Sequence, residues 1–95
     1  MKQVELKSPK PKSIEVWVVL PERVLLLDIA GPLEVLRRAN AEQRALRFVV
    51  RYIGANSRVT SSVGVPLTDI APFPTRLPEE AIVVVPGSAD GIAFA

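Results

Sequence analysis

The sequence contains neither cysteine nor histidine among its 95 residues. The absence of cysteine excludes disulfide bonds, thiolate nucleophiles and thiolate metal ligands within the chain, and it fits a reducing compartment. The absence of histidine removes the most common general base and the most common metal ligand. We therefore predict that the chain contains no catalytic residue and no metal site, and that it binds no cofactor.

Long apolar runs are also missing. Glu15, Pro21, Glu22 and Arg23 interrupt the apolar start of the chain, which therefore matches neither a signal peptide nor a membrane helix of roughly 20 apolar residues. The composition, 48% hydrophobic and 23% charged, is typical of a folded globular domain, and the length suits one small domain. We expect a soluble, cytoplasmic protein that has no membrane partner.

An excess of positive charge is confined to the N-terminus. In residues 1–12 four lysines stand against Glu5, whereas the rest of the chain carries eight basic and nine acidic side chains. We interpret residues 1–12 as a flexible, solvated basic arm, with contact to phosphate or a membrane surface as the alternative. A nucleic-acid-binding body normally concentrates basic residues on one face, and the composition of residues 13–95 does not suggest such a face.

Three runs predict the main strands. Residues 14–20 are a short run rich in valine and residues 81–85 are a β-branched apolar run; such runs are typical of strands buried on both faces, and residues 81–85 predict a buried strand most clearly. Residues 47–53 alternate between two sides, which also predicts a strand. Residues 59–67 predict a short hairpin or edge segment, and the proline-rich residues 69–78 predict an irregular connection.

A helix is predicted between the first two long strands. Pro32 fits its first turn, where a missing N–H costs nothing, and the helix should run to about Arg44 with Asn40 as a possible point of fraying. Glu34 precedes Arg38 by four residues, a spacing that favours an ion pair on the helix surface.

The order of these elements predicts an α/β fold. We expect a partial, flavodoxin-like three-layer sandwich with a mostly parallel sheet over residues 13–95, in which the first two long strands and their helix form a right-handed crossover. Strands as apolar as 81–85 need cover on both faces, and only one full helix is available. The domain is therefore expected to be truncated and marginally folded on its own.

Polar residues at two strand-to-helix junctions are the candidates for a site. Asp28 follows the first apolar segment, where a carboxylate often faces a ligand; an N-cap or first-turn role beside the helix dipole is equally compatible. Gly87 serves a tight turn, and Ser88 would first cap a helix that starts near Ala89 and secondly contact a ligand. Trp17, between valines, is expected in the core.

Four segments together resemble the ThiJ/PfpI superfamily, the flavodoxin-like domain related to class I glutamine amidotransferases. They are residues 27–35 (LDIAGPLEV), 37–40 (RRAN), 61–64 (SSVG) and 82–87 (IVVVPG). The similarity runs from about residue 14 to residue 95. It is greatest to the branch that is fused to AraC-type transcriptional regulators.

The resemblance implies roles for three residues. In enzymes of the superfamily, an acidic residue from the first helix opening hydrogen-bonds a cysteine on a tight elbow, and Asp28 matches that acid. Gly87 and Ser88 match the segment whose backbone N–H groups line the pocket. Because the elbow and its cysteine are expected beyond Ala95, the resemblance implies that Asp28, Gly87 and Ser88 bind a ligand and are not themselves catalytic.

Three functions remain open from the sequence. The leading hypothesis is the N-terminal portion of a ligand-sensing domain that binds an unidentified small molecule, forms a homodimer, and reaches DNA only through a C-terminal helix-turn-helix module outside this chain. The second is a fragment of a ThiJ/PfpI-type cysteine enzyme, similar to isonitrile hydratases or to amidases and peptidases. The third is a short self-associating protein without catalysis.

Overall fold

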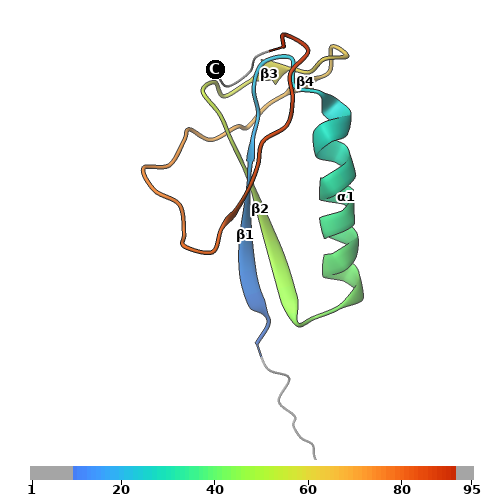
Figure 1. The fold of residues 1–95 in the computed structure, drawn as a ribbon, viewed down its shortest axis with the longest axis vertical. Coiled ribbons are helices and arrows are strands. Elements are labelled where there is room, and N and C mark those ends of the chain that lie inside the picture. The colour runs from blue at the N-terminus through green and yellow to red at the C-terminus, as the bar shows by residue number, and fades with distance from the viewer. Residues whose placement is uncertain (1–9, 92–95) are drawn as a thin grey trace, which may run out of the picture.

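The computed structural model describes residues 10–91 (Figure 1). One helix lies beside a small sheet, and a two-stranded hairpin lies at one end of that sheet. The elements in chain order are β1 (Lys12–Val19), α1 (Leu26–Glu42), β2 (Leu46–Ile53), β3 (Val59–Thr60), β4 (Pro66–Leu67) and β5 (Ile82–Val84).

The main sheet is parallel, with the strand order β2-β1-β5. β1 pairs with β2 over its whole length, from Lys12 opposite Leu46 to Val19 opposite Ile53, and its other edge pairs with β5. The prediction of a mixed α/β fold with a parallel sheet is confirmed. β1 begins at Lys12, which the sequence had placed in the N-terminal arm; residues 1–9 of that arm lie outside the described residues.

The start of α1 differs from the prediction. The helix begins at Leu26, so Asp28 lies in its first turn and Pro32 lies inside it. Two backbone bonds fix this earlier start: the N–H of Leu25 donates to the Gly87 carbonyl, and the N–H of Asp28 donates to the Leu25 carbonyl, both at 2.9 Å. Pro32 cannot donate to the carbonyl of Asp28 four residues earlier, and α1 continues across this missing bond.

Side chains near the end of α1 hold the chain as it turns into β2. The helix ends at Glu42, two residues before the predicted end, and Asn40 does not mark a fraying point. Gln43 donates from Nε2 to the carbonyls of Ala39 and Leu46 and accepts at Oε1 from the N–H of Leu46. One side chain thereby ends the helix and begins the strand.

The ion pairs on the surface of α1 also differ from the prediction. Glu34 pairs with Arg37 three residues later, at 2.7 Å, and Arg38 pairs with Glu42. Both spacings lie on one helix face, so either partner is reachable for Glu34. All four side chains are well exposed, and such pairs contribute at most about 1 kcal/mol to stability.

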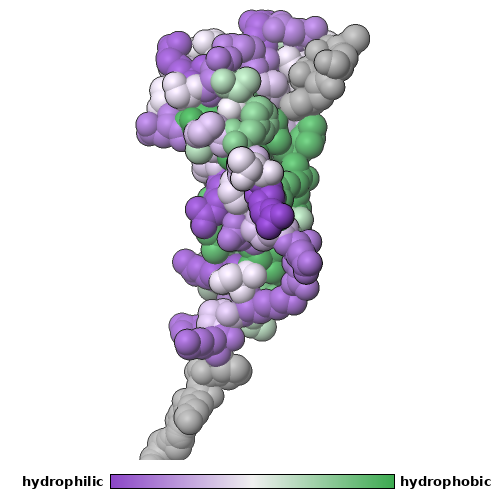
Figure 2. Space-filling view, turned by 90° about the vertical axis from the view of Figure 1, so that its left-hand side faces the viewer, coloured by the Kyte–Doolittle hydropathy of each residue, from purple (hydrophilic) through white to green (hydrophobic). Residues whose placement is uncertain are grey.

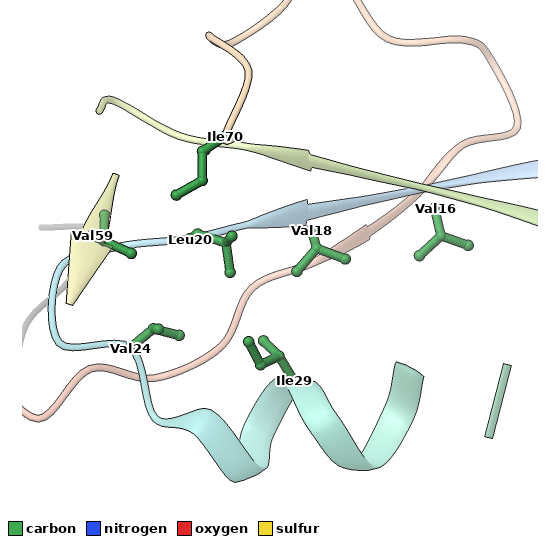
Figure 3. Packing of buried hydrophobic residues seen from close by; sticks show 7 residues of the cluster. All are labelled: Val16, Val18, Leu20, Val24, Ile29, Val59 and Ile70. Atoms are coloured by element: carbon green, nitrogen blue, oxygen red, sulfur yellow. The ribbon is translucent and has the colours of Figure 1, made fainter. Parts of the chain in front are cut away.

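The core lies between α1 and one face of the sheet (Figure 3). Alternate residues of β1 point toward α1, where Ile29 is the buried helix residue. Residues outside the main sheet complete the hydrophobic cluster at the carboxyl end of β1. Its members are Val16, Val18, Leu20, Val24, Ile29, Val59 and Ile70.

The hairpin and the irregular connection follow the prediction. β3 and β4 pair antiparallel, with Val59 opposite Leu67, and residues 68–81 form no named helix or strand. Ser61 is fully buried at the hairpin turn, where its hydroxyl accepts from the N–H of Val65 at 3.0 Å. The polar segment at 61–64 is therefore a turn that is built from its own hydrogen bonds.

Residues 81–85 contain the predicted strand, but the expectation that this strand is buried is wrong. Ile82, Val83 and Val85 are 45%, 42% and 58% exposed. β5 lies at an edge of the sheet, paired only with β1 among the described residues. Within residues 10–91 α1 is the one helix, and it packs on one face of the sheet. The other face has no helix over it there, so β5 is not buried on both faces as its apolar sequence favours.

Trp17 also differs from its prediction. It alternates with Val16 and Val18 on β1 and therefore lies on the face turned away from α1, half-buried and outside the core cluster. The guanidinium carbon of Arg51 lies 5.6 Å from the centre of its ring, a cation–π contact. Within residues 10–91, no helix has the length and apolar character needed to cross a membrane.

Candidate functional site

The three residues singled out in the sequence come together at the carboxyl ends of β1 and β5. The chain leaves β1 toward α1 and β2 on one side, while β5 lies on the other side of β1. In open parallel sheets, ligands bind outside the carboxyl ends of the strands, at the point where neighbouring connections diverge. Asp28, Gly87 and Ser88 lie at this point.

A direct hydrogen bond joins Asp28 to Gly87. The Gly87 N–H donates to Oδ2 of Asp28 at 3.0 Å, across 59 residues of sequence. The Leu25 N–H donates in return to the Gly87 carbonyl. Two hydrogen bonds therefore join the start of α1 to the turn after β5, one through the N–H of Gly87 and one through its carbonyl.

The close approach of these two segments explains the glycine. A Cβ added at Gly87 would lie 3.0 Å from Cδ1 of Leu25 and 3.2 Å from Oδ2 of Asp28. Both distances are shorter than ordinary van der Waals contact, so a larger residue would require the Leu25 and Asp28 side chains to shift. The sequence indicated a tight turn here, but it did not indicate that α1 would approach it.

Ser88 holds the same turn from the inside. Its side chain is buried, its hydroxyl donates to the Glu22 carbonyl at 2.9 Å, and the same oxygen accepts from the Asp90 N–H at 3.0 Å. Residues 89–90 form a turn in place of the helix expected to start near Ala89; residues 92–95 lie outside the described residues. Because both functions of the hydroxyl are in use, Ser88 positions the loop in this arrangement.

Asp28 remains able to bind. Asp28 is exposed, and its Oδ1 makes no hydrogen bond within residues 10–91. A carboxylate oxygen accepts only, so the complementary group is a donor such as an amine, an amide or a hydroxyl. The position at the first turn of α1 also suits a negative charge, because the helix dipole is positive there.

A hollow of about 510 Å³ opens beside Asp28. Leu25 and Leu27 line it from the start of α1, and Ser62 and Val63 line it from the β3–β4 turn. The Ser62 N–H donates to the Val24 carbonyl at 2.8 Å, which holds the hairpin turn against this corner. No pattern in the sequence indicated that the 61–64 turn would lie next to Asp28, because the two segments are far apart along the chain.

The arrangement offers groups for recognising a ligand. No cluster of three or more acidic side chains suited to a metal ion occurs within residues 10–91. The site combines one free carboxylate oxygen, an apolar rim and a rigid backbone turn, which suits a small molecule with a donor group and an apolar part. No protein-family model matches the chain, and no curated protein matches it either.

Proposed function

We propose that this chain is the N-terminal portion of a ligand-sensing, ThiJ/PfpI-like domain of an AraC-type transcriptional regulator. One observation supports this most: Asp28, the acid of the 27–35 segment, reaches the turn of the 82–87 segment through the Gly87 N–H. These are two of the segments on which the resemblance depends. A flavodoxin-like sandwich is the fold proposed for the whole domain, since the sheet order β2-β1-β5 is compatible with it.

The proposed ligand is a small molecule with a hydrogen-bond donor and an apolar part, and no cofactor is required. It would bind to Oδ1 of Asp28 and lie against Leu25 and Leu27. Gly87 and Ser88 would hold the turn that fixes the carboxylate. A ligand of this kind regulates only if it binds the two states of the regulator with different affinity.

The regulator is proposed to act as a homodimer and to contact DNA through a helix-turn-helix module outside this chain. The charge of residues 13–95 supports this division, because eight basic and nine acidic side chains give no excess of positive charge. Asp28 would then couple ligand occupancy to the position of α1.

Ligand binding is tested by titrating the ¹⁵N-labelled chain with ethylammonium and with acetamide, two small donors that differ in charge. We expect the backbone amide signals of Gly87, Ser88 and Asp28 to shift, and the shifts to disappear in Asp28→Ala. Signals that move only near Asn40 and Arg47, where a separate hollow lies, would contradict the proposed site.

The regulatory role is tested by the nucleotide sequence downstream of the Ala95 codon. A paired helix-turn-helix module in the same reading frame supports the regulator. A cysteine on a strand–turn–helix elbow with no DNA-binding module beyond it supports the cysteine enzyme in its place, with Asp28 oriented toward that thiol. A frame that contains neither would overturn both.

A further inference from the structure

Basic side chains from two distant segments lie at the amino end of the sheet. β1 begins there, and the turn from α1 into β2 lies beside its first residue (Figure 1), since the Lys12 N–H donates to the Ala45 carbonyl at 3.0 Å. Lys10, which precedes β1, is therefore at the same end as Arg44 and Arg47. Figure 2 shows hydrophilic surface at this lower end of the molecule. The composition did not indicate this concentration of charge, because the two segments are far apart along the chain.

The charge of these basic residues is not neutralised by neighbouring carboxylates. Lys10, Arg44 and Arg47 are exposed and belong to none of the ion pairs formed within residues 10–91. Glu42, the last residue of α1, is paired with Arg38. An anion that binds at this end therefore meets cations that have no acidic partner in the described part of the chain.

A hollow of about 540 Å³ opens at the same place, within the range of small-molecule pockets. Arg44 and Arg47 line it, Pro11, Ala41 and Leu46 add an apolar lining, and no acidic residue lines it. Its two amide side chains are occupied by hydrogen bonds to the backbone. The backbone N–H of Arg44 makes no hydrogen bond within residues 10–91, so it is a further donor.

We infer that this hollow binds the phosphate group of a small phosphate ester. Guanidinium groups match the oxygens of phosphate with paired N–H donors, and Arg44 and Arg47 supply two of them. The apolar lining would contact the organic part of the ester, and Lys10 would add attraction at longer range. The inference goes beyond the proposed sensor, because this second site lies at the other end of the sheet from Asp28 and does not depend on it.

The limited extent of the charge favours a small phosphate ester over a nucleic acid. A nucleic-acid backbone is bound by basic side chains that continue along a face. Here Arg37 and Arg38, the preceding basic residues of α1, are both paired with glutamates, and Arg51, further along β2, is paired with Glu15. The hollow also lies beside β2, whereas β5 is on the other side of β1, so a sheet that continues past β5 grows away from it.

Arg44 alone has a simpler explanation, because a cation just beyond the end of α1 is favourable beside the negative end of the helix dipole. That effect falls off within the last turn of a helix. Arg47 lies in β2 and is therefore outside its range. A phosphate site requires both arginines, whereas a role at the helix end requires Arg44 alone.

Titration of the ¹⁵N-labelled chain with phenyl phosphate tests the site, with benzyl alcohol as the analogue that lacks phosphate. We expect saturable shifts at the amide signals of Arg44, Ala45 and Arg47 with phenyl phosphate only. Arg44→Gln and Arg47→Gln should each weaken binding by about tenfold, since each removes hydrogen bonds to a charged group. Arg58→Gln, at an exposed arginine that forms no ion pair within residues 10–91, is the matched control and should bind as the unmodified chain does.

Three results would overturn the inference. Shifts that do not saturate, or an equal loss in Arg58→Gln, would show non-specific attraction only. A lower melting temperature in Arg44→Gln with unchanged phenyl phosphate binding in both variants would show a role at the helix end. Tighter binding of duplex DNA than of phenyl phosphate, weakened by the same two variants, would make the surface a nucleic-acid interface. Failure here with intact shifts at Gly87 in the ethylammonium titration would leave the proposed sensor standing.

Discussion

The side chain of Asn40 binds the backbone of Phe48 as a neighbouring strand would. Its Nδ2 donates to the Phe48 carbonyl at 2.9 Å, and its Oδ1 accepts from the Phe48 N–H at 2.8 Å. β2 lies at an edge of the sheet, and this carboxamide satisfies both polar groups of one of its residues. Asn40 thereby joins α1 to β2, in addition to the bonds that Gln43 makes to Ala39 and Leu46.

Replacing Asn40 by alanine should destabilise the chain by about 1–3 kcal/mol, because two partly buried backbone groups lose their partner. Urea denaturation followed by circular dichroism measures this change. Arg38→Ala serves as the control, since its exposed pair with Glu42 should contribute under about 1 kcal/mol. Equal midpoints for Asn40→Ala and the unmodified chain would show that the bonds contribute nothing.

Two glycines should respond in opposite directions to alanine. Gly87→Ala should cost about 1–3 kcal/mol, because its Cβ would press on Leu25 and Asp28. Gly31→Ala, inside α1 and with no atom within 4 Å of the added Cβ, should stabilise by about 0.5–1 kcal/mol. Thermal melts of both variants at one protein concentration give the comparison. The same sign for both would refute the close approach at Gly87.

Loss of the Asp28 carboxylate should free the turn after β5. In Asp28→Ala the Gly87 N–H loses its acceptor, so its hydrogen exchange should quicken several-fold, with a stability loss of about 0.5–1.5 kcal/mol. Asp28→Asn keeps an acceptor oxygen and should exchange almost as the unmodified chain does. NMR exchange at Gly87 measures both, and slow exchange in Asp28→Ala would mean that another group holds this amide.

Ile29 should be the most sensitive position in α1. It is the buried residue of the helix, so Ile29→Ala should cost about 2–5 kcal/mol and reduce the helical signal. Val35, which is 67% exposed on the same helix, gives a matched control in Val35→Ala that should change stability by less than about 0.5 kcal/mol. If the two variants unfold alike, α1 does not depend on the sheet.

The sequence determined the local features of this protein. Apolar runs, alternation and proline spacing indicated the strands near 14–20, 47–53 and 81–85, the helix between the first two, and the irregular 69–78 segment. These features depend on neighbouring residues, so a periodic pattern records them. The sequence did not predict the start of α1, because the helix begins ahead of Pro32, directly after the bond from the Leu25 N–H to the Gly87 carbonyl.

Only the tertiary structure decided what the strands and polar residues face. The AIVVV run predicts burial by its composition, yet β5 lies at an edge, because burial depends on which other elements cover a strand. Three other contacts also join segments that are distant in the sequence. They are the hydrogen bond between Asp28 and Gly87, the packing of the 61–64 turn beside Asp28, and the hydrogen bonds between Asn40 and Phe48. Contacts between distant residues leave no periodic signal in a single sequence.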